Sequence, residues 1–362
     1  MKIVHITSIY DVIREDSGAR ALMIYLLAKK QLEEGHEVLI VANQLSKLDT
    51  CKILSFSRML KLRYNRVINW LLRRLVESHQ HFEALKKFQS DVDIVHSHIT
   101  EEGTYLSSVF KVPIIVTNHG TPNVNKCSFI LSKFLSIINK AKIVAISYRN
   151  YIINRMIYGH NVIGYVYNGL DIAKIPFTAK PNKSHDIELC FAGRIIPIKG
   201  VHVAIKVADI LHREGNDVLL KIHGIPYPGY YKYLHRILSM AKQRRYVYVK
   251  LNLPKNKLYE SLGNCDALLF PSLFDEPFGY IIIETMATGT PVIAFPVGAV
   301  PEIICDEVNG FLVHNIKGMV NAVMSIYKIN RHRVREYVHK KFNVESMYKN
   351  YLNIYKKVLE DE

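Results

Sequence analysis

The stretch LCFAGRIIPIKGV (189–201) places two cationic side chains between an apolar run and a helical pattern. The apolar run predicts a strand that ends at Gly193, and a helix is expected from about Gly200. Arg194 and Lys199 therefore lie in the connecting loop. The free N–H groups of a helix N-terminus suit phosphate, and so do arginine and lysine. The alternative is that both cations are simply solvated.

A second stretch, FPSLFDEPFGYIIIETMATG (270–289), carries carboxylates at a similar junction. Asp275 and Glu276 follow an apolar run, a helix is expected from about Gly279, and Glu284 lies inside its first turns. Carboxylates are strong acceptors for sugar and ribose hydroxyls. The alternative is an acid that stabilises the helix dipole, together with a solvated glutamate. For Glu284 this is disfavoured, because its isoleucine neighbours indicate burial, where an unpaired acid is costly.

Short β-branched runs alternate with helical patterns along the chain, in two series. The first series predicts strands at 2–7, 36–43, 93–98, 112–118, 142–147 and 162–167, with a helix at 19–34. The second predicts strands at 188–193, 217–224, 246–251, 266–272 and 291–295, with helices near 201–214, 229–243, 255–263 and 279–288. Apolar strands separated by helices predict two doubly wound α/β domains with parallel sheets. Such sheets bind ligands at the carboxyl ends of their strands.

The order of several motifs resembles that of a known family. R-x4-K-G (194–200) precedes E-P-F-G-x4-E (276–284), and weaker signs occur at EEGHEV (33–38), VTNHG (116–120), YNGLD (167–171), VGAVPEII (297–304) and NGFLV (309–313). Over nearly the whole chain the combination resembles family 4 glycosyltransferases of the GT-B fold. The resemblance implies two Rossmann-like parallel-sheet domains facing a central cleft. An acceptor-binding domain would span 1–167, with a C-terminal helix at 345–362 crossing back onto it, and a nucleotide-sugar-binding domain would span 168–344.

The resemblance assigns most donor contacts to the second domain. Arg194 and Lys199 would hold the donor diphosphate and offset the charge of the departing nucleotide. Glu284 would accept hydrogen bonds from the ribose, and Glu276 would contact the transferred sugar. The remaining donor-binding residues in this domain would be Gly224 and, through their backbone, Phe278 and Gly279.

Two residues of the first domain also gain a role from the resemblance. His119 stands where the family has a histidine facing the sugar, and with Glu276, Arg194 and Lys199 it completes the expected catalytic set. Gly18 belongs to a loop that would close over the diphosphate. Here the chain departs from the family pattern, because Ser17-Gly18 stands where many members carry paired glycines.

The activity that the resemblance implies is that of a retaining, hexosyltransferase-type glycosyltransferase using a UDP-sugar. The acceptor would be a glycan, lipid-linked, in cell-envelope polysaccharide or lipopolysaccharide biosynthesis. One alternative is a transferase that makes a soluble disaccharide or small-molecule glycoside. Another is a basic nucleic-acid-binding protein. This is disfavoured because the aromatic residues are not interleaved with the basic ones, as a base-stacking surface requires.

Metal binding is a further alternative for the first domain. His96 and His98 alternate onto one strand face, with His119 on a following strand, and Asp91-Val92-Asp93 has the form of a D-x-D metal motif. We favour structural or substrate contacts for the histidines and a turn before a strand for the aspartates. We therefore expect no metal and no cofactor, because the nucleotide-sugar is a substrate.

Composition narrows the class of protein and its partners. The 362 residues are 49% apolar and 22% charged, which excludes disordered, collagen-like and disulfide-scaffold chains. The 48 Lys and Arg against 32 Asp and Glu give a net charge of +16, which suggests a polyanionic partner. Five dispersed cysteines indicate a reducing compartment, and no apolar run reaches the ~18–20 residues of a membrane span. We expect a cytoplasmic protein.

Basic residues are densest in a segment of the first domain. Residues 58–77 can form an amphipathic helix with an apolar stripe beside a row of arginines. It would either pack on its own domain or lie at the inner, anionic face of the cytoplasmic membrane, and we favour the membrane. The residues of this membrane or acceptor surface are Arg63, Arg66, Trp70, Arg73 and Arg74.

Overall fold

The computed structural model describes residues 1–8, 10–49, 51–55, 79–87, 91–120, 140–179, 181 and 184–361. The chain divides into two compact units. Unit 1 holds Met1–Gly169 and Val344–Glu362, and unit 2 holds Leu170–Asn343. The unit limits, at residues 169 and 343, differ by one or two residues from the domain limits of 167 and 344 expected from the sequence.

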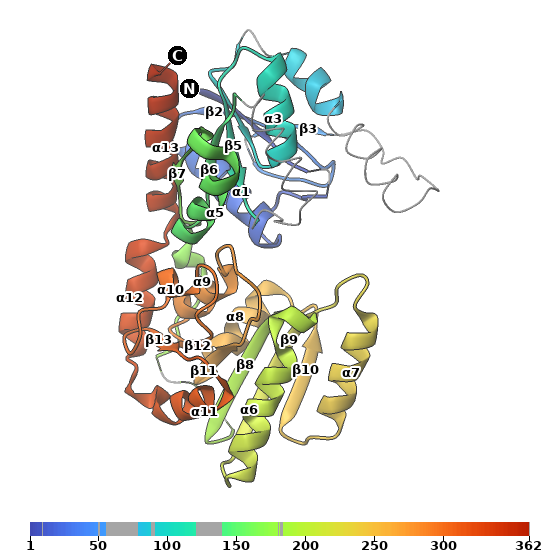
Figure 1. Ribbon diagram of the computed structural model, residues 1–362, viewed down its shortest axis with the longest axis vertical. Coiled ribbons are helices and arrows are strands. Elements are labelled where there is room, and N and C mark those ends of the chain that lie inside the picture. The colour runs from blue at the N-terminus through green and yellow to red at the C-terminus, as the bar shows by residue number, and fades with distance from the viewer. Residues whose placement is uncertain are drawn as a thin grey trace. The chain divides into compact units, whose positions relative to one another are not determined.

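Unit 1 contains a seven-stranded sheet in the order β3-β2-β1-β4-β5-β6-β7 (Figure 1). Every neighbouring pair is parallel. The strands are β1 (Lys2–Ile6), β2 (Glu37–Ala42), β3 (Lys52–Ser55), β4 (Ile94–Ser97), β5 (Ile114–Asn118), β6 (Lys142–Ala145) and β7 (Val162–Tyr165). The helices are α1 (Ala19–Glu33), α3 (Thr100–Val109), α5 (Tyr148–Tyr158) and α13 (Val344–Glu360), with the 3-10 turn η1 (Gly159–Asn161).

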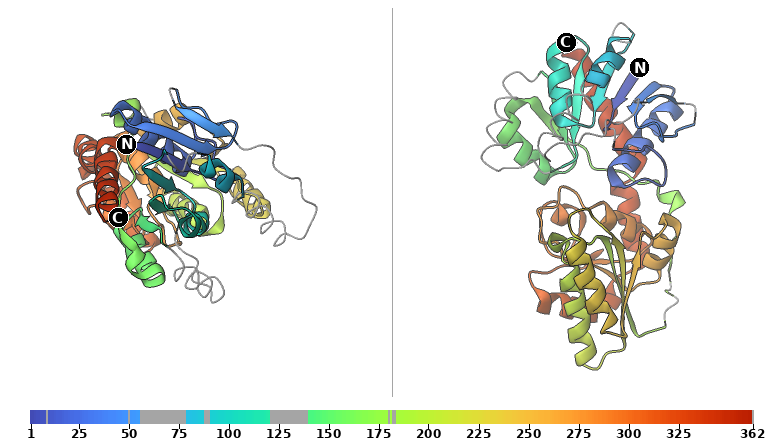
Figure 2. Two further views of the ribbon diagram at one scale, coloured as in Figure 1. Left: turned by 90° about the horizontal axis from the view of Figure 1, so that it is seen from above. Right: turned by 90° about the vertical axis from the view of Figure 1, so that its right-hand side faces the viewer.

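The two faces of this sheet bury different side chains. Val4 and Val95 pack in an apolar core with Leu106 of α3. Alternate positions of the same strands carry His5 and His96, which hydrogen-bond to side chains of α1 and α13. Side chains of a strand alternate between its two faces, so α1 and α13 cover the face opposite to α3. In the right-hand view of Figure 2, α13, in red, runs along the strands of unit 1.

Unit 2 contains a six-stranded sheet in the order β10-β9-β8-β11-β12-β13. Every neighbouring pair is parallel. The strands are β8 (Ile187–Arg194), β9 (Val218–Ile225), β10 (Val247–Leu251), β11 (Ala267–Phe270), β12 (Val292–Ala294) and β13 (Gly310–Leu312). The helices are α6 (Val201–Arg213), α7 (Tyr231–Lys242), α8 (Lys255–Gly263), α9 (Tyr280–Ala287), α10 (Val300–Ile303), α11 (Ile316–Ser325) and α12 (Arg331–Lys341). The 3-10 turns are η2 (Ile172–Lys174), η3 (Pro197–Lys199) and η4 (Ile326–Lys328).

The predicted parallel α/β fold is confirmed, with one additional strand in each sheet. β3 and β13 were missed because each is a very short edge strand. The predicted amphipathic segment 58–77, with its arginines and Trp70, lies outside the described residues. Among the residues that the structure describes, none of the helices combines the length and apolar character needed to cross a bilayer.

Candidate active site

In unit 2, the loop that follows β8 is held against the loop that follows β11. β8 ends at Arg194, and η3 leads from there into α6. The N–H of Leu273 donates to the carbonyl oxygen of Ile198 at 2.8 Å. Gly200 has a φ of +70°, and a Cβ at this position would overlap the carbonyl oxygen of Pro271. The close approach of the two loops therefore requires glycine.

This approach brings Lys199 and Glu276 together. Lys199 Nζ forms an ion pair with Glu276 Oε1, and Ser272 Oγ donates to the same oxygen at 2.7 Å. Glu276 is buried, with 4% of its surface exposed. The cation that the family resemblance assigns to the diphosphate is thus adjacent to the carboxylate that it assigns to the sugar. A bound phosphate would compete with Glu276 for Lys199.

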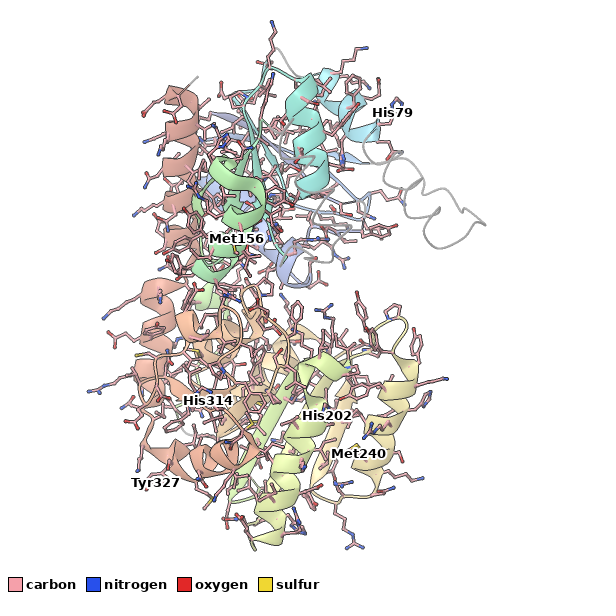
Figure 3. All side chains as sticks on the ribbon, in the orientation of Figure 1. His79, Met156, His202, Met240, His314 and Tyr327 are labelled. Atoms are coloured by element: carbon pink, nitrogen blue, oxygen red, sulfur yellow. The ribbon has the colours of Figure 1, made fainter. Side chains whose placement is uncertain are left out.

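Arg194 has an aromatic neighbour that the sequence analysis missed. Its guanidinium carbon lies 5.0 Å from the ring centroid of Tyr227, within the range of a cation–π contact. Tyr227 belongs to the P-Y-P-G-Y loop (226–230) after β9. An aromatic residue in a Pro/Gly loop at the carboxyl end of a strand was the available signal. His202, labelled in Figure 3, lies on the first turn of α6. It hydrogen-bonds Tyr233 of α7 at 2.8 Å, which ties these two helices together.

Glu284 is a buried carboxylate with two polar neighbours on α8. It is 7% exposed, Tyr259 Oη donates to its Oε1 at 2.8 Å, and Lys255 Nζ lies 3.7 Å from that oxygen. Burial raises the pKa of Glu284, while Lys255 and the Tyr259 hydrogen bond act in the opposite direction. The sequence analysis identified Glu284 but neither partner. The pair of α8 residues holds the carboxylate in a fixed position.

Gly224, Phe278 and Gly279, the three other predicted donor-binding residues of unit 2, lie in closely packed surroundings. A Cβ at Gly224 would overlap the side chain of Ile195. The ring of Phe278 is 2% exposed and packs edge-on against Phe342 at 5.8 Å. Gly279, with a φ of +97°, is the N-cap of α9. What Phe278 and Gly279 can offer a ligand is therefore their backbone.

Gly18 of unit 1 is the N-cap of α1. Its φ of −63° is ordinary, and a Cβ there would meet nothing within 4 Å of the described residues. Its conformation therefore does not require glycine. Two residues further along the chain, Arg20 donates to Asp11 at 2.8 Å. Burial lowers the pKa of His119, and the charge of Arg20 lowers it further.

A group of buried histidines lies beside His119. Ring nitrogens of His5, His96 and His98 lie within 4.8 Å of one another, whereas the metal alternative that the sequence raised, and that we disfavoured, was His96, His98 and His119. Both ring nitrogens of His5, His96 and His98 already make hydrogen bonds within the protein. A metal ion would have to replace several of these bonds.

The D-x-D stretch, Asp91-Val92-Asp93, lies at the amino ends of the strands of unit 1, whereas His98 and His119 follow the carboxyl ends of β4 and β5. Asp93 accepts a 2.7 Å hydrogen bond from the backbone N–H of Lys2, and Asp91 forms an ion pair with the Lys2 ammonium. Both aspartates precede β4, at its amino end. They therefore fix the start of the strand, in agreement with the turn interpretation.

Two solved structures illustrate the fold that this chain shares. A structure of Anabaena HepE in complex with UDP and glucose superposes with a TM-score of 0.75 at 16% identity, covering 99% of this chain and all of that one. The apo structure of WaaB, a lipopolysaccharide outer core galactosyltransferase, gives 0.71 at 18% identity, with 99% and 100% covered. At these identities the likeness establishes the fold.

Sequence comparisons support the same class of enzyme. Residues 174–341 match the family model described as glycosyl transferases group 1. The chain is a GT-B glycosyltransferase. An uncharacterized glycosyltransferase of Methanocaldococcus jannaschii, MJ1607, is 24% identical over 377 residues, with 95% of both chains covered. The matched region of this glycosyltransferase contains Arg194, Lys199, Glu276 and Glu284.

Proposed function

We propose that this glycosyltransferase takes its sugar from a UDP-sugar and transfers it, with retention of configuration, to a glycan acceptor. In this proposal unit 2 binds the donor and unit 1 binds the acceptor. The acceptor is lipid-linked and belongs to cell-envelope polysaccharide or lipopolysaccharide biosynthesis. The likeness to HepE with UDP and glucose, and to WaaB, supports the donor and the acceptor class respectively.

One observation carries the donor assignment. The ion pair of Lys199 with buried Glu276 lies in the paired loops where Arg194 leaves β8, at the carboxyl ends of parallel strands. Phosphates bind at such strand ends, where helix N-termini converge. Buried Glu284, positioned by Tyr259, supplies an acceptor for ribose hydroxyls. Cations for a diphosphate and carboxylates for hydroxyls therefore occur together in one unit.

The chemistry follows from these charges. The bond from the anomeric carbon to the diphosphate breaks, the acceptor oxygen forms a new bond on the same face, and the acceptor proton passes to the leaving phosphate. Arg194 and Lys199 offset the negative charge on the diphosphate, and Glu276 stabilises the positive charge on the sugar. Because two side-chain cations serve the diphosphate, we propose that transfer needs no metal ion. Activity that survives EDTA would agree, and activity restored only by added Mg²⁺ or Mn²⁺ would contradict it.

The donor is tested by measuring nucleotide release from UDP-, GDP- and ADP-sugars, with and without candidate acceptors. We expect release from a UDP-sugar, enhanced by a lipid-linked glycan more than by a free disaccharide. Lys199→Ala and Glu284→Ala should lose most of this activity, whereas Lys257→Ala, an exposed cation of the same unit, should keep it. Full activity in either site variant would refute its assigned role. NMR of the product gives the anomeric configuration, and inversion would contradict the retaining mechanism.

We also propose that the segment 58–77 binds the anionic inner face of the cytoplasmic membrane. The support is its sequence pattern alone, with arginines beside an apolar stripe. Co-sedimentation with anionic vesicles should be lost when Arg66, Arg73 and Arg74 are changed together to Glu. Equal sedimentation of both proteins would reject the membrane contact.

A further inference from the structure

Four side chains of unit 1 form a continuous hydrogen-bonded row, here called the histidine chain: Gln31, His5, His98 and His119. Gln31 Oε1 lies 2.7 Å from His5 Nε2, and His5 Nδ1 lies 3.0 Å from His98 Nε2. His98 Nδ1 then lies 3.0 Å from His119 Nε2. The row runs from α1 through β1 to the carboxyl ends of β4 and β5. It thereby connects the interior with the residue assigned to the sugar.

The inner members of the histidine chain are shielded from water. Gln31 and His5 are fully buried and His98 is 3% exposed, while His119 is partly exposed. Burial lowers the pKa of His5 to about 4 and of His119 to about 3, and it lowers the pKa of His98 strongly. All three rings are therefore neutral near pH 7. A neutral imidazole has one N–H and one unprotonated nitrogen, so each ring donates on one side and accepts on the other.

The orientation of Gln31 gives the row a direction. Gln31 Nε2 donates to Tyr355 Oη at 3.1 Å, which turns the amide oxygen toward His5. That oxygen can only accept, so His5 carries its proton on Nε2 and accepts at Nδ1. His98 must then donate from Nε2 and accept at Nδ1. His119 in turn donates from Nε2, which leaves its Nδ1 unprotonated.

A nearby cation helps to keep the outer rings neutral. Burial is the main cause that lowers the pKa of His98 and of His119, and the charge of Arg20 is a further one. A positive charge beside an imidazole disfavours the doubly protonated ring, so each ring keeps one unprotonated nitrogen. No partner of His119 Nδ1 is recorded within the described part of the chain, although both nitrogens of His5 and His98 have one. His119 Nδ1, the acceptor at the end of the row, is therefore the atom that can bind a ligand.

We propose that Gln31, His5 and His98 are positioning residues that hold His119 as its Nε2–H tautomer, with Nδ1 as an acceptor for a hydroxyl of the transferred sugar. The identity of that ligand rests on the proposed function, whereas the tautomer does not. The direction of the whole row depends on one amide, since rotating the Gln31 amide would reverse every donor and acceptor. The position of the proton on His119 is thus set by a residue two histidines away.

The tautomer can be observed directly by ¹⁵N NMR of the full-length protein labelled at histidine. The two His119 signals are assigned by their loss in His119→Gln. In the wild type we expect Nε2 at the shift of a protonated nitrogen and Nδ1 at that of an unprotonated one. The reverse assignment in the wild type overturns the proposal, and the tautomer itself is measured on the wild-type protein.

A variant of similar shape tests the role of the amide. Gln31→Met removes the acceptor, so His5 would bury an unpaired N–H unless its proton moved to Nδ1. We expect the row to reverse, the His119 proton to move to Nδ1, and kcat/KM for the donor to fall about tenfold, the effect of one lost hydrogen bond. Tyr351→Phe removes a buried hydroxyl of α13 that bonds Thr117 outside the row, and should change neither readout.

The outcomes separate this inference from the proposed function. An unchanged His119 tautomer in Gln31→Met overturns the positioning by Gln31. A reversed tautomer with unchanged kcat/KM overturns the contact with the sugar. A wild type that turns over no nucleotide-sugar while His119 carries its proton on Nε2 refutes the proposed function and leaves the tautomer assignment supported.

Discussion

Lys199 and Glu276 form an ion pair inside unit 2, and Ser272 donates a second hydrogen bond to the same carboxylate oxygen. The side chains of Lys199 and Glu276 are 14% and 5% exposed. Each residue thus has a partner within the protein and, in the proposed function, also contacts the nucleotide-sugar. Lys199 is shared between Glu276 and the diphosphate, so the pair couples donor binding to the local stability of the two loops.

Removing one member of this pair should destabilise the protein. Lys199→Ala leaves a buried carboxylate without its cation, which typically costs about 3–5 kcal/mol. Urea unfolding should therefore show a loss of about 3 kcal/mol in the free energy of unfolding. In the control Lys257→Ala, the pair with Glu260 is about 60% exposed on both sides, and a change below about 1 kcal/mol is expected. Equal losses of unfolding free energy in the two variants would show that the buried Lys199–Glu276 pair stabilises the protein no more than an exposed pair does.

The hydroxyl of Tyr259 should set the acidic limit of activity. Its hydrogen bond lowers the pKa of Glu284, so Tyr259→Phe raises that pKa further above its usual value. If ionised Glu284 accepts from the ribose, kcat/KM for the donor should begin to fall at a higher pH in this variant. A pH profile measures the shift. Tyr246→Phe, which removes a 2.8 Å hydrogen bond to Asp209 elsewhere in unit 2, should leave the profile unchanged.

Gly200 should be far less tolerant of substitution than another glycine of similar backbone conformation. Gly200→Ala drives a methyl group into the carbonyl oxygen of Pro271, so we expect a loss of about 3 kcal/mol or more in unfolding free energy. Gly215 also has a positive φ, of +88°, but a Cβ there would meet nothing within 4 Å. Gly215→Ala should therefore cost only about 1–2 kcal/mol. Comparable melting curves for the two variants would contradict the close approach of the loops.

The buried histidines should make the protein acid-sensitive. The pKa of His5 is about 4 and that of His119 about 3 in the folded protein, below the value of 6.5 for a free imidazole. The unfolded state therefore binds more protons once the pH falls below 6.5, and the stability present above that pH is lost down to about pH 4 for His5 and about pH 3 for His119. Each such histidine contributes about 1.4 kcal/mol per pH unit.

Urea unfolding at a series of pH values measures this slope. His119→Gln removes one titrating ring and should make the dependence shallower by one histidine. A free energy of unfolding that stays constant or rises between pH 6.5 and 5 would contradict the neutral state of these rings in the folded protein.

Much of the fold and of the donor site could be predicted because the informative residues are local in sequence. Arg194 and Lys199 are five positions apart, in one loop after an apolar strand. Glu276 and Glu284 are likewise in one loop-and-helix segment. In both segments the change from a strand pattern to a helical pattern marks a strand end, where ligands of parallel sheets bind.

The partners of these residues could not be predicted in the same way. Tyr259 and Glu284 are 25 positions apart on different helices, and Gln31 and Tyr355 are 324 positions apart. The contact of Tyr259 with Glu284 depends on how α8 packs beside α9, and that of Gln31 with Tyr355 on how α13 packs beside α1. The periodicity of a single helix shows that a side chain is buried but not which polar group it meets.

Titration of nucleoside diphosphates into the protein tests the central claim most directly. We expect UDP to bind more tightly than GDP or ADP, and its affinity to fall at least about tenfold in Lys199→Ala, the loss of one charge-assisted hydrogen bond. The exposed control Lys257→Ala should bind UDP as the wild type does. Equal affinity of the wild type and Lys199→Ala for UDP would contradict the donor site described for unit 2.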